Sequence, residues 1–455
     1  MRWRRRRVHL CALLVILLFL LFAGAFLGLR FYSIDIGKFG INPADSRSPL
    51  LSLSTSVLSS VATNLTQMLD RHCNRPESIG QLAKSSMEGQ FAGMEDYELA
   101  LVQVVTRHGD RSPIYDNSLS NWHDYRCPRK TEYNSVNHLD FLKPCGQAML
   151  TLTGCRQHQV IGKHFRDVYK LYNEDIASKI MLVSTVYQRT TRSALCLVSG
   201  LLGHTRFDRI TTSSSVMFQD SPLRHTRYPK KCNKKDKLWR LVYDQDTFRL
   251  ARKRWESVRS EVNDIVVGLG WPPVQDIVHL FDGVVCHYCH LYAEGVRDSM
   301  TPCIGRNCLP LSVAVEIIRT ADLSTKLNYD RKISVVLAQP LLASIVNEME
   351  GWINGSMKSR FILYSGHDST ITALLSALEA FDGHRPPYAS RLVFELWQRK
   401  GQNSAHIVRV LYNGHVVQSS FIDQLMPFDG FKQGLLFGHL RDPASYLSAC
   451  LSGSW

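Results

Sequence analysis

The sequence predicts an α/β protein with a doubly wound, mostly parallel sheet flanked by helices, an inserted mainly helical cap domain and an N-terminal transmembrane helix. Short apolar stretches typical of buried strands alternate with segments of helical spacing. Three of these stretches end directly in loops that carry Arg, His or Asp. The carboxyl ends of neighbouring parallel strands lie at one edge of a sheet, where ligands bind. The pattern therefore predicts a site for an anionic ligand at that edge.

The strands and helices of the predicted core follow one another along the chain. Apolar runs of strand length alternate with segments that combine apolar positions at helical spacing with charges. Asn413-Gly414, between two extended segments, predicts a tight hairpin turn. The expected elements are strand 99–105, helix 146–171, strand 179–183, strand 361–364, helix 371–380, strand 391–398 and strand 406–412.

The middle of the chain differs in character from both flanking parts. Between residues 206 and 335, basic and helical segments dominate, and the strand signals weaken. The chain is also longer than a single hydrophobic core usually supports. We therefore expect a cap domain over 206–335, inserted into a core made of residues 96–205 and 336–455.

The N-terminus has the pattern of a signal anchor. Residues 1–7 contain five arginines, and residues 8–29 contain no Asp, Glu, Lys or Arg. A helix of that length spans the ~30 Å apolar core of a bilayer. A cleaved signal peptide is the alternative, because Ala23-Gly24-Ala25 resembles a cleavage site, but the apolar stretch is longer than a signal peptide usually has. The basic flank predicts type II topology, with residues 1–7 cytoplasmic and a lumenal stem over 30–95.

Several features agree with a lumenal location for the rest of the chain. Asn64 and Asn354 each begin an N-glycosylation sequon. Eleven of the twelve cysteines follow the predicted anchor, which suits an oxidising compartment, although an odd number leaves at least one outside an intrachain pair. Six arginines precede residue 31, so the net charge of +14 leaves +8 for the remainder. That excess favours anionic substrates or acidic polysaccharides, and no nucleic-acid-binding motif is present.

The strongest motif follows the strand at 99–105. Residues 107–113 read Arg-His-Gly-Asp-Arg-Ser-Pro, which places one imidazole between two guanidinium groups. Arginine binds planar oxyanions through paired N–H donors, and histidine is the side chain best suited to act near neutral pH. We expect Gly109 to let the backbone approach an anion, Pro113 to stiffen the loop and Asp110 to have a structural role.

Two further strand-end loops carry weaker signals. Gly366-His367-Asp368 comes soon after the strand at 361–364, and Arg189 follows the strand at 179–183. Taken alone, His367 could be a structural histidine and Arg189 a surface residue. Because all three loops follow strands of one predicted sheet, we expect them to form one site.

These residues identify a resemblance to the histidine acid phosphatases, a branch of the histidine phosphatase superfamily. It covers roughly residues 95–450, and the residue before Arg189 is Gln188, where the family often has an acidic one. The matching segments are 107–113 with R-H-G-x-R-x-P, 366–368 with the distal His-Asp element, 152–162 with a glycine-containing helix and 184–190 with S-T-x-x-x-R-T.

The resemblance implies a histidine-phosphatase core and a phosphomonoesterase that needs no cofactor or metal. His108 would be the nucleophile that becomes phosphorylated, and Asp368 would be the proton donor. The substrate phosphate would be bound by Arg107, Arg111, Arg189 and His367.

A narrower resemblance concerns segments outside the site. Residues 86–89, 286–290 and 391–398, with Cys303 and Cys308, resemble those of a Golgi member of the family that removes the 2-phosphate from xylose in the linkage region of proteoglycans. This implies a single-pass Golgi membrane protein with glycosyltransferases as possible partners. The alternatives are a broad-specificity acid phosphatase, an inositol polyphosphate phosphatase, a non-catalytic protein that binds anionic glycans, and a structural subunit of a transferase complex.

The cysteine-rich segment of the insert admits three interpretations. Cys286-x-x-Cys289-His290 fits the attachment pattern of c-type haem. The same two cysteines with Cys303 and Cys308 have spacing that zinc could use. Disulfides are commoner in a lumenal domain, and we expect them to brace the cap.

Overall fold

The computed structural model describes residues 55–114, 124–128, 142–172, 174–203, 233–274, 276–304, 306–402 and 405–435. All contacts reported below lie within one compact unit, residues 59–455. The predicted cytoplasmic tail and membrane anchor, residues 1–29, fall outside the described residues. No helix in the described part of the chain is both long and apolar enough to cross a membrane.

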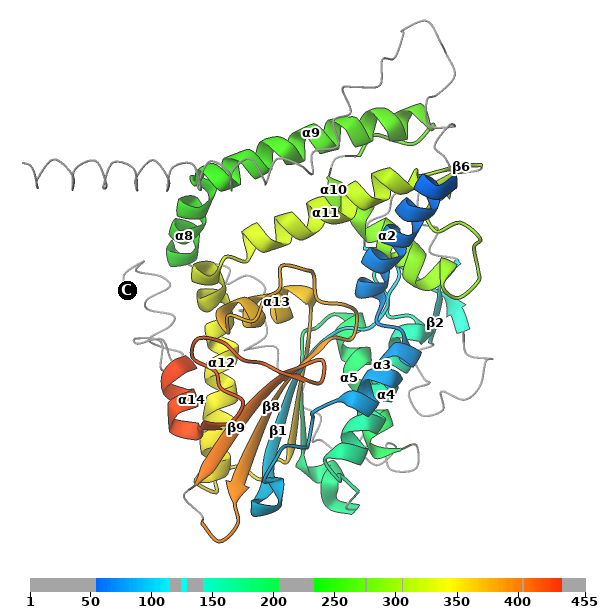
Figure 1. Cartoon of the computed structure of the whole chain (residues 1–455). Coiled ribbons are helices and arrows are strands. Elements are labelled where there is room, and N and C mark those ends of the chain that lie inside the picture. Colours follow the sequence, from blue (N-terminus) through cyan, green and yellow to red (C-terminus); the bar gives the residue numbers. More distant parts are fainter. Residues whose placement is uncertain are drawn as a thin grey trace, which may run out of the picture. The chain divides into compact units, whose positions relative to one another are not determined.

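A mixed sheet forms the centre of the fold (Figure 1). Its strand order is β10-β9-β8-β1-β7-β4, and β11 also pairs with β9. The pairs β1–β7 and β7–β4 are parallel, whereas β8 and β9 run antiparallel to their neighbours. The strands are β1 (Tyr97–Arg107), β4 (Ile180–Ser184), β7 (Phe361–Gly366), β8 (Arg391–Arg399), β9 (His406–Tyr412), β10 (His415–Val416) and β11 (Met426–Pro427).

The mixed strand directions correct the prediction of a mostly parallel sheet. Parallel neighbours need a crossover connection, and one is available between β1, β4 and β7, where helices intervene. Only a short connection joins β8 to β9, so this pair must be antiparallel. The turn predicted at Asn413-Gly414 is confirmed, because both residues have positive φ and Tyr412 pairs with His415.

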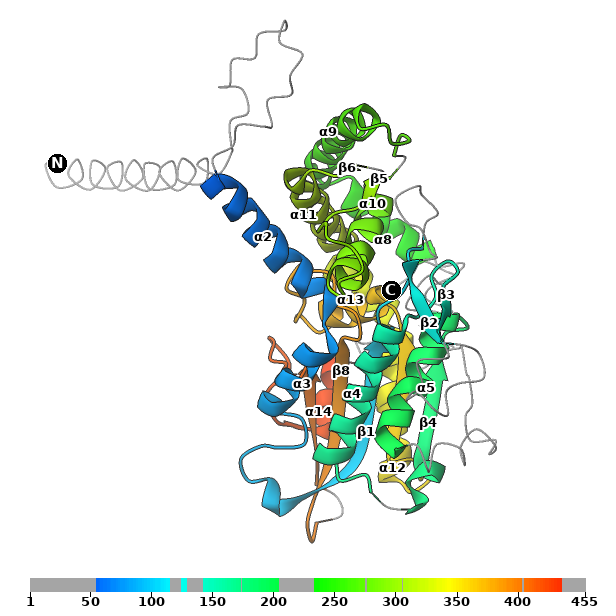
Figure 2. The ribbon, with the colours of Figure 1, turned by 90° about the vertical axis from the view of Figure 1, so that its right-hand side faces the viewer.

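Helices cover both faces of the sheet (Figure 2). Leu101 and Val105 of β1 pack into the apolar core on one face, and Val102 and Val104 pack into the core on the other. Burial on both faces explains why this strand is a continuous apolar run. The first core includes α12 (Arg331–Ile353), α13 (Asp368–Ala377) and α14 (Phe428–Leu435), and the second includes α3 (Pro76–Ser85), α4 (Leu152–Val168) and α5 (Gln188–Leu202).

The insert is mainly helical, and most of it has an apolar core of its own. α9, α10 and α11 surround this core, while Val242 of α8 packs into the first sheet core. Its helices are α8 (Asn233–Tyr243), α9 (Asp246–Gly268), α10 (Ile277–Cys286), the π-helical continuation η7 (His287–Tyr292) and α11 (Leu311–Asn328). The remaining short elements are η3 (Met94–Asp96), β2 (Arg126–Pro128), β3 (Leu142–Pro144), η6 (Glu174–Lys179), β5 (Cys303–Ile304) and β6 (Asn307–Cys308).

The stem predicted over 30–95 is wrong for its second half. Helix α2 (Thr55–Cys73) buries Leu65 and Leu69 in the core of the cap, and Ile79 of α3 is buried against the sheet. The i, i+4 spacing of Leu65 and Leu69 is too short a pattern to stand out in a serine-rich sequence. Their burial depends on contacts with residues about two hundred positions further along the chain.

Disulfides account for most cysteines of the described residues. The pairs are Cys73–Cys289, Cys127–Cys145, Cys155–Cys196 and Cys303–Cys308. Cys286 is buried and forms no disulfide. A cysteine sulfur in a disulfide cannot bind zinc or attach haem. The zinc and haem interpretations of the cysteine segment are therefore wrong. The expectation that disulfides brace the cap is confirmed.

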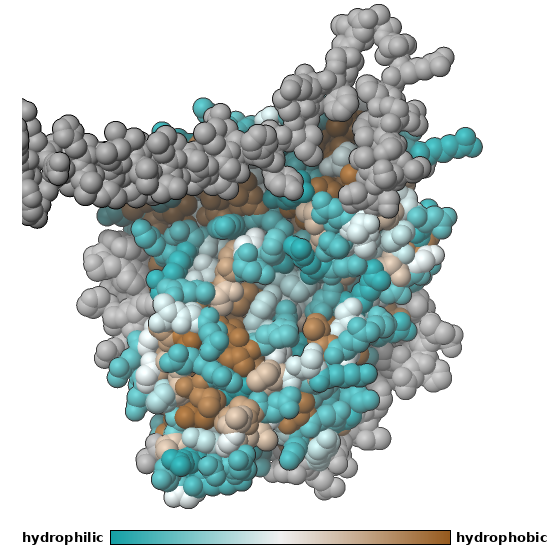
Figure 3. Space-filling model, viewed as in Figure 1, coloured by the Kyte–Doolittle hydropathy of each residue, from teal (hydrophilic) through white to brown (hydrophobic). Residues whose placement is uncertain are grey.

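The lower part of the face seen in Figure 3 is mostly hydrophilic with small hydrophobic groups, and a broader hydrophobic band lies along its upper part. Large apolar side chains of the sheet, such as Phe361, Phe394 and Leu396, are fully buried instead. This separation is what the alternation of buried strands and amphipathic helices requires.

Helices α4 and α5 lie so close that glycine is needed between them. A Cβ atom at Gly162 would come within 1.9 Å of the carbonyl oxygen of Leu197. We predict that Gly162→Ala lowers the free energy of unfolding by about 2–3 kcal/mol or more. Gly80→Ala in α3 is the control, because a Cβ there meets no atom within 4 Å, and it should stabilise by up to about 1 kcal/mol. Urea unfolding of both variants tests this, and equal effects would contradict it.

Candidate active site

Three strand ends meet at the carboxyl edge of the parallel part of the sheet. The N–H of His108 donates to the carbonyl of Gly366 at 3.0 Å, and that of Thr185 donates to Ser365 at 3.3 Å. These bonds extend the β1–β7 and β4–β7 pairings by one residue beyond the strands. The loops that follow β1, β4 and β7 are therefore held side by side, as the sequence predicts.

The structure brings together all six residues that the sequence singles out. A cavity of about 250 Å³ is lined by five of them, His108, Arg111, Arg189, His367 and Asp368. Arg107 lines a small adjoining hollow of about 20 Å³, which also contacts Arg111 and Asp368. The cap residues Val278, Asp282, Thr325 and Tyr329 form the other wall of the cavity.

The His108 imidazole is held in one orientation at the base of the site. It is buried, and its Nδ1 lies 2.8 Å from the carbonyl oxygen of Gly109. Because a carbonyl only accepts, Nδ1 carries the proton of the neutral ring, and Nε2 keeps its lone pair. Burial, and then the charges of Arg189 and Arg107, hold the pKa of His108 well below its ordinary value. The ring is therefore neutral at mildly acidic pH.

Arg107 and Arg111 are fixed by contacts on their outer sides. The guanidinium of Arg107 lies 4.3 Å from the ring centre of Tyr388 and donates to the carbonyl of Pro386. Arg111 donates to Asp282 at 2.6 Å, and both side chains of this ion pair are buried. Such buried charges must be paired, and Asp282 supplies the pairing from the cap.

Arg189 and His367 form the opposite side of the site. Arg189 lies over the ring of Tyr187 at 4.7 Å, and its Nη2 is 3.4 Å from Nδ1 of His367. The other ring nitrogen of His367 lies 3.0 Å from the hydroxyl of Thr185. Arg189 is in the first turn of α5, and His367 caps α13, so two helix N-termini also face the site.

The surroundings of Asp368 favour the ionised form of its carboxyl group. It is the first residue of α13, and the N–H of Ser369 donates to it at 2.8 Å. Burial alone would raise its pKa, but the nearby charges of Arg107 and Arg385 outweigh burial and hold the pKa of Asp368 well below its usual range. A negative charge that enters the site would oppose the effect of these arginines and raise the pKa of Asp368 again.

Sequence reasoning missed three side chains that shape the site. Asp282 pairs with Arg111, Tyr388 lies against Arg107, and Arg385 lines the cavity while its Nε donates to Thr325 at 2.9 Å. Asp282 has one signal in the sequence, because it is the single acidic residue within the apolar segment Ile277–Cys286. Arg385 and Tyr388 lie in a loop with no recognisable motif.

Two expectations for the motif loop have different outcomes. Asp110 is structural as predicted, because it is buried and bonds to the hydroxyl of Thr151 and to Nδ1 of His290 at 2.9 Å. For Gly109 the structure shows a packing requirement, and its predicted approach to an anion stays a prediction. Its N–H donates to Ser193, and a Cβ atom there would lie 2.4 Å from the carbonyl oxygen of Gly154. Glycine is required so that this loop can lie against α4.

The two predicted glycosylation sites are compatible with the fold. Asn64 lies on α2 and Asn354 follows α12, and both side chains are exposed. Neither residue is near the cavity lining. Glycan attachment at both asparagines stays a prediction.

The site places a neutral imidazole among three guanidinium groups, at the edge of an α/β sheet and under a helical cap. This arrangement is suited to binding phosphate esters. The fold and site are those of a phosphatase that uses histidine. The family profile of the histidine phosphatase superfamily (branch 2) matches residues 98–267 and 295–413, so the chain belongs to this family. It is accordingly a phosphoric monoester hydrolase.

Curated relatives agree with this assignment, and solved structures agree with the fold. The chain is 29% identical to 2-phosphoxylose phosphatase 1 of Mus musculus, over 75% of each chain. It is 26% identical to testicular acid phosphatase of Homo sapiens, over 67% of this chain and 68% of that protein.

In structure the chain resembles the multiple inositol polyphosphate phosphatase of Bifidobacterium longum. The TM-score is 0.56 and the identity 14%, over 81% of this chain and 98% of that one. It also resembles the phytase of Citrobacter braakii, with a TM-score of 0.53 and 14% identity, over 76% of this chain and 99% of that one. At such identities, these two structures bear on the fold alone.

The charge on Asp368 leads to a prediction about anion binding. Sulfate stays a dianion at pH 5, so any proton taken up when it binds must go to the protein. We predict net proton uptake near pH 5, because the anion raises the pKa of Asp368. Titration calorimetry in buffers of different ionisation enthalpy measures the uptake.

Two variants test which group takes up the proton when sulfate binds. Asp368→Asn should take up clearly less than the wild-type protein. A bound anion would also favour protonation of His108. His108→Ala removes that group but keeps Asp368, so most of the proton uptake should remain. Equal uptake by wild type and Asp368→Asn would contradict the role of Asp368.

Proposed function

We propose that the enzyme hydrolyses phosphomonoesters through a phosphohistidine at His108. The observation that carries this proposal is the Nε2 lone pair of a neutral His108 ring, enclosed by Arg107, Arg111 and Arg189. In-line attack of Nε2 on phosphorus forms the N–P bond while the bond from phosphorus to the ester oxygen breaks. Two displacements replace one difficult step, which is the usual benefit of covalent catalysis.

The guanidinium groups bind the phosphoryl oxygens. A phosphomonoester carries about two negative charges near neutral pH, and the transferring group keeps its charge on three oxygens. Arg107, Arg111 and Arg189 stabilise this charge, and His367 adds a hydrogen bond. Because these groups are already held by Tyr388, Asp282 and Tyr187, they need little reorganisation when the reaction occurs.

Asp368 moves the proton in both steps. The bound dianion raises its pKa, so the carboxylic acid can protonate the departing sugar oxygen. The resulting carboxylate then takes a proton from the water that attacks the phosphohistidine. Phosphate and a regenerated His108 are the products, and the proton balance closes over the cycle.

The substrate we propose is the 2-O-phosphate of xylose in the linkage region between glycosaminoglycan and protein in proteoglycans. The similarity to 2-phosphoxylose phosphatase 1 of several vertebrates, at about 28–29% identity, supports it. A broad-specificity acid phosphatase is the second candidate, favoured by the similarity to testicular acid phosphatase.

We further propose a Golgi location, with single-pass type II topology and a lumenal catalytic domain. The basic and apolar pattern of residues 1–29 supports it, as do the two sequons. The disulfides fit an oxidising lumen. Glycosyltransferases of the same pathway would then be available as partners.

One assay separates the candidates. The purified protein is given a phosphoxylosyl linkage oligosaccharide, an aryl phosphate and inositol hexakisphosphate, and kcat/KM is compared. The proposed substrate should be preferred over the other two. Equal rates on all three would favour the broad acid phosphatase. Absence of turnover on every ester, with retained binding of anionic glycans, would overturn the enzymatic proposal.

The nucleophile can be tested directly. His108→Ala should lower kcat by about 10⁴-fold or more, because the covalent route is lost. Rapid quenching of the wild-type enzyme with labelled ester, followed by peptide mapping, should place the label on His108. A label on another residue during active turnover would exclude His108 as the nucleophile.

The proton donor can be tested through the leaving group. Asp368→Asn should slow alkyl phosphates, whose alkoxide leaves poorly, by about 10²–10⁴-fold. An aryl phosphate needs little protonation, and its rate should fall much less, by less than about tenfold. Comparable losses on both esters would show that Asp368 acts in some other way.

A further inference from the structure

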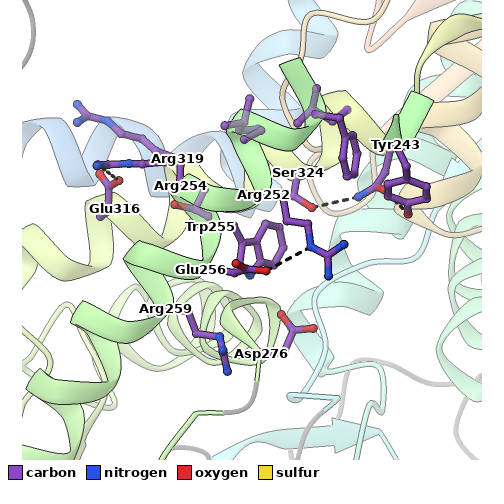
Figure 4. Close-up of a pocket in the computed structure, with 16 residues that line it drawn as sticks. Tyr243, Arg252, Arg254, Trp255, Glu256, Arg259, Asp276, Glu316, Arg319 and Ser324 are labelled. Carbon is purple, nitrogen blue, oxygen red and sulfur yellow. Dashed lines mark hydrogen bonds and ion pairs between the residues drawn. The ribbon is translucent and has the colours of Figure 1, made fainter. Parts of the chain in front are cut away.

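The cap contains a second cavity, separate from the active site and larger. It encloses about 640 Å³ between α9, α11 and the end of α8 (Figure 4). The active-site cavity measures about 250 Å³. Pockets of several hundred Å³ are of the size that small organic ligands occupy. The reaction proposed above uses none of the residues that line this second cavity.

Aromatic side chains form the apolar part of this cap cavity. The rings of Tyr243 and Phe248 meet edge to face with centres 4.3 Å apart, and Trp255 lies among the charged groups in Figure 4. Trp255 also packs against the core of the cap, so its ring is held in position. An aromatic face of this kind suits the apolar C–H face of a sugar ring.

Polar groups of both signs surround the aromatic rings. Arg252 pairs with Glu256 at 3.2 Å, and Arg254 pairs with Glu316 at 2.8 Å. Arg252, Glu256 and Arg254 are exposed and Glu316 is partly exposed, so a ligand can reach their remaining donors and acceptors. Arg259 and Arg319 are also exposed and form no ion pair with another described residue.

This mixture favours a hydroxyl-rich ligand over a highly charged one. A sugar hydroxyl both donates and accepts, so it can bond to guanidinium and to carboxylate groups at once. The four arginines of the lining face three carboxylates, those of Asp276, Glu256 and Glu316. The active site, taken together with its adjoining hollow, is lined by four arginines and two carboxylates, which is a larger positive excess and suits a phosphate dianion better.

The two cavities lie on opposite sides of the same chain segments. On α11, Ser324 lines the cap cavity and the next residue, Thr325, lines the active site. Likewise, Asn328 lines the cap cavity and Tyr329, the next residue, lines the active site. One helix therefore separates the two spaces, and a helix with its side chains is only about 10 Å across.

We propose that the cap cavity is a subsite for the sugars joined to the phosphorylated sugar in the active site. The inference rests on the function proposed above and extends it. The phosphorylated residue occupies the small cationic cavity, and neighbouring residues of the oligosaccharide cross α11 and stack on Trp255. The cap then selects the substrate by its length, and the arginine cluster at the sheet edge selects it by its phosphate.

The test compares a short and a long substrate with the same phosphate. Xylose 2-phosphate glycoside and the phosphorylated linkage tetrasaccharide are assayed with wild type, Trp255→Ala, Arg259→Ala and Arg319→Ala. Lys253→Ala is the matched control, because Lys253 is an exposed cation on α9 outside the cavity lining. Arg259 and Arg319 are exposed, so their variants remain informative where Trp255→Ala disturbs the cap.

Wild type should show a lower KM for the tetrasaccharide than for the monosaccharide. Each cavity variant should reduce that advantage by about threefold to tenfold, the effect of losing one aromatic or polar contact. Lys253→Ala should keep it. A wild-type KM that is equal for both lengths, or cavity variants that behave like Lys253→Ala, would overturn the subsite and leave the proposed function intact. If wild type hydrolyses aryl phosphate but neither xylose ester, the proposed substrate fails, and the subsite fails with it.

Discussion

The site depends on holding several positive charges together out of water. Arg107, Arg111 and Arg189 are all buried around His108, and like charges at such short range repel one another strongly. The fold offsets this repulsion on the outer side of each guanidinium, with the ring of Tyr388, the carboxylate of Asp282 and the ring of Tyr187. The inner side is left to the substrate dianion, which has the charge that the cluster needs.

This arrangement makes the cap part of the catalytic centre. Asp282, which pairs with Arg111, belongs to α10, and His290, which bonds to Asp110 of the motif loop, belongs to the π-helical segment that follows. The disulfide from Cys73 to Cys289 fixes that segment to α2. A change in the cap can therefore alter catalysis through the loop, as well as substrate choice through the cavities.

The sequence predicts the site better than it predicts the sheet. The loops after β1, β4 and β7 were expected to meet because each motif directly follows an apolar strand, and parallel strands bring such loops to one edge. The direction of β8 relative to β1 is not predictable, since an apolar run has the same appearance in either orientation. The short connection between β8 and β9, in contrast, requires that pair to be antiparallel. Asp282, Arg385 and Tyr388 act through partners that are distant in the sequence. Leu65 and Leu69 likewise pack against residues that are distant in the sequence, so the sequence predicts only a stem there.

In the mechanism proposed above, one carboxylate serves two opposite steps, and the same positive cluster accounts for this. With the site empty, the guanidiniums keep Asp368 ionised, and the group is then a poor acid. The substrate dianion cancels part of that field, so a proton becomes stable on Asp368 while the ester is bound. When the proton has gone to the leaving group, the cationic surroundings favour the carboxylate again, which is the form needed to accept a proton from water. In this proposal, the charge of the bound ester determines when Asp368 acts as an acid.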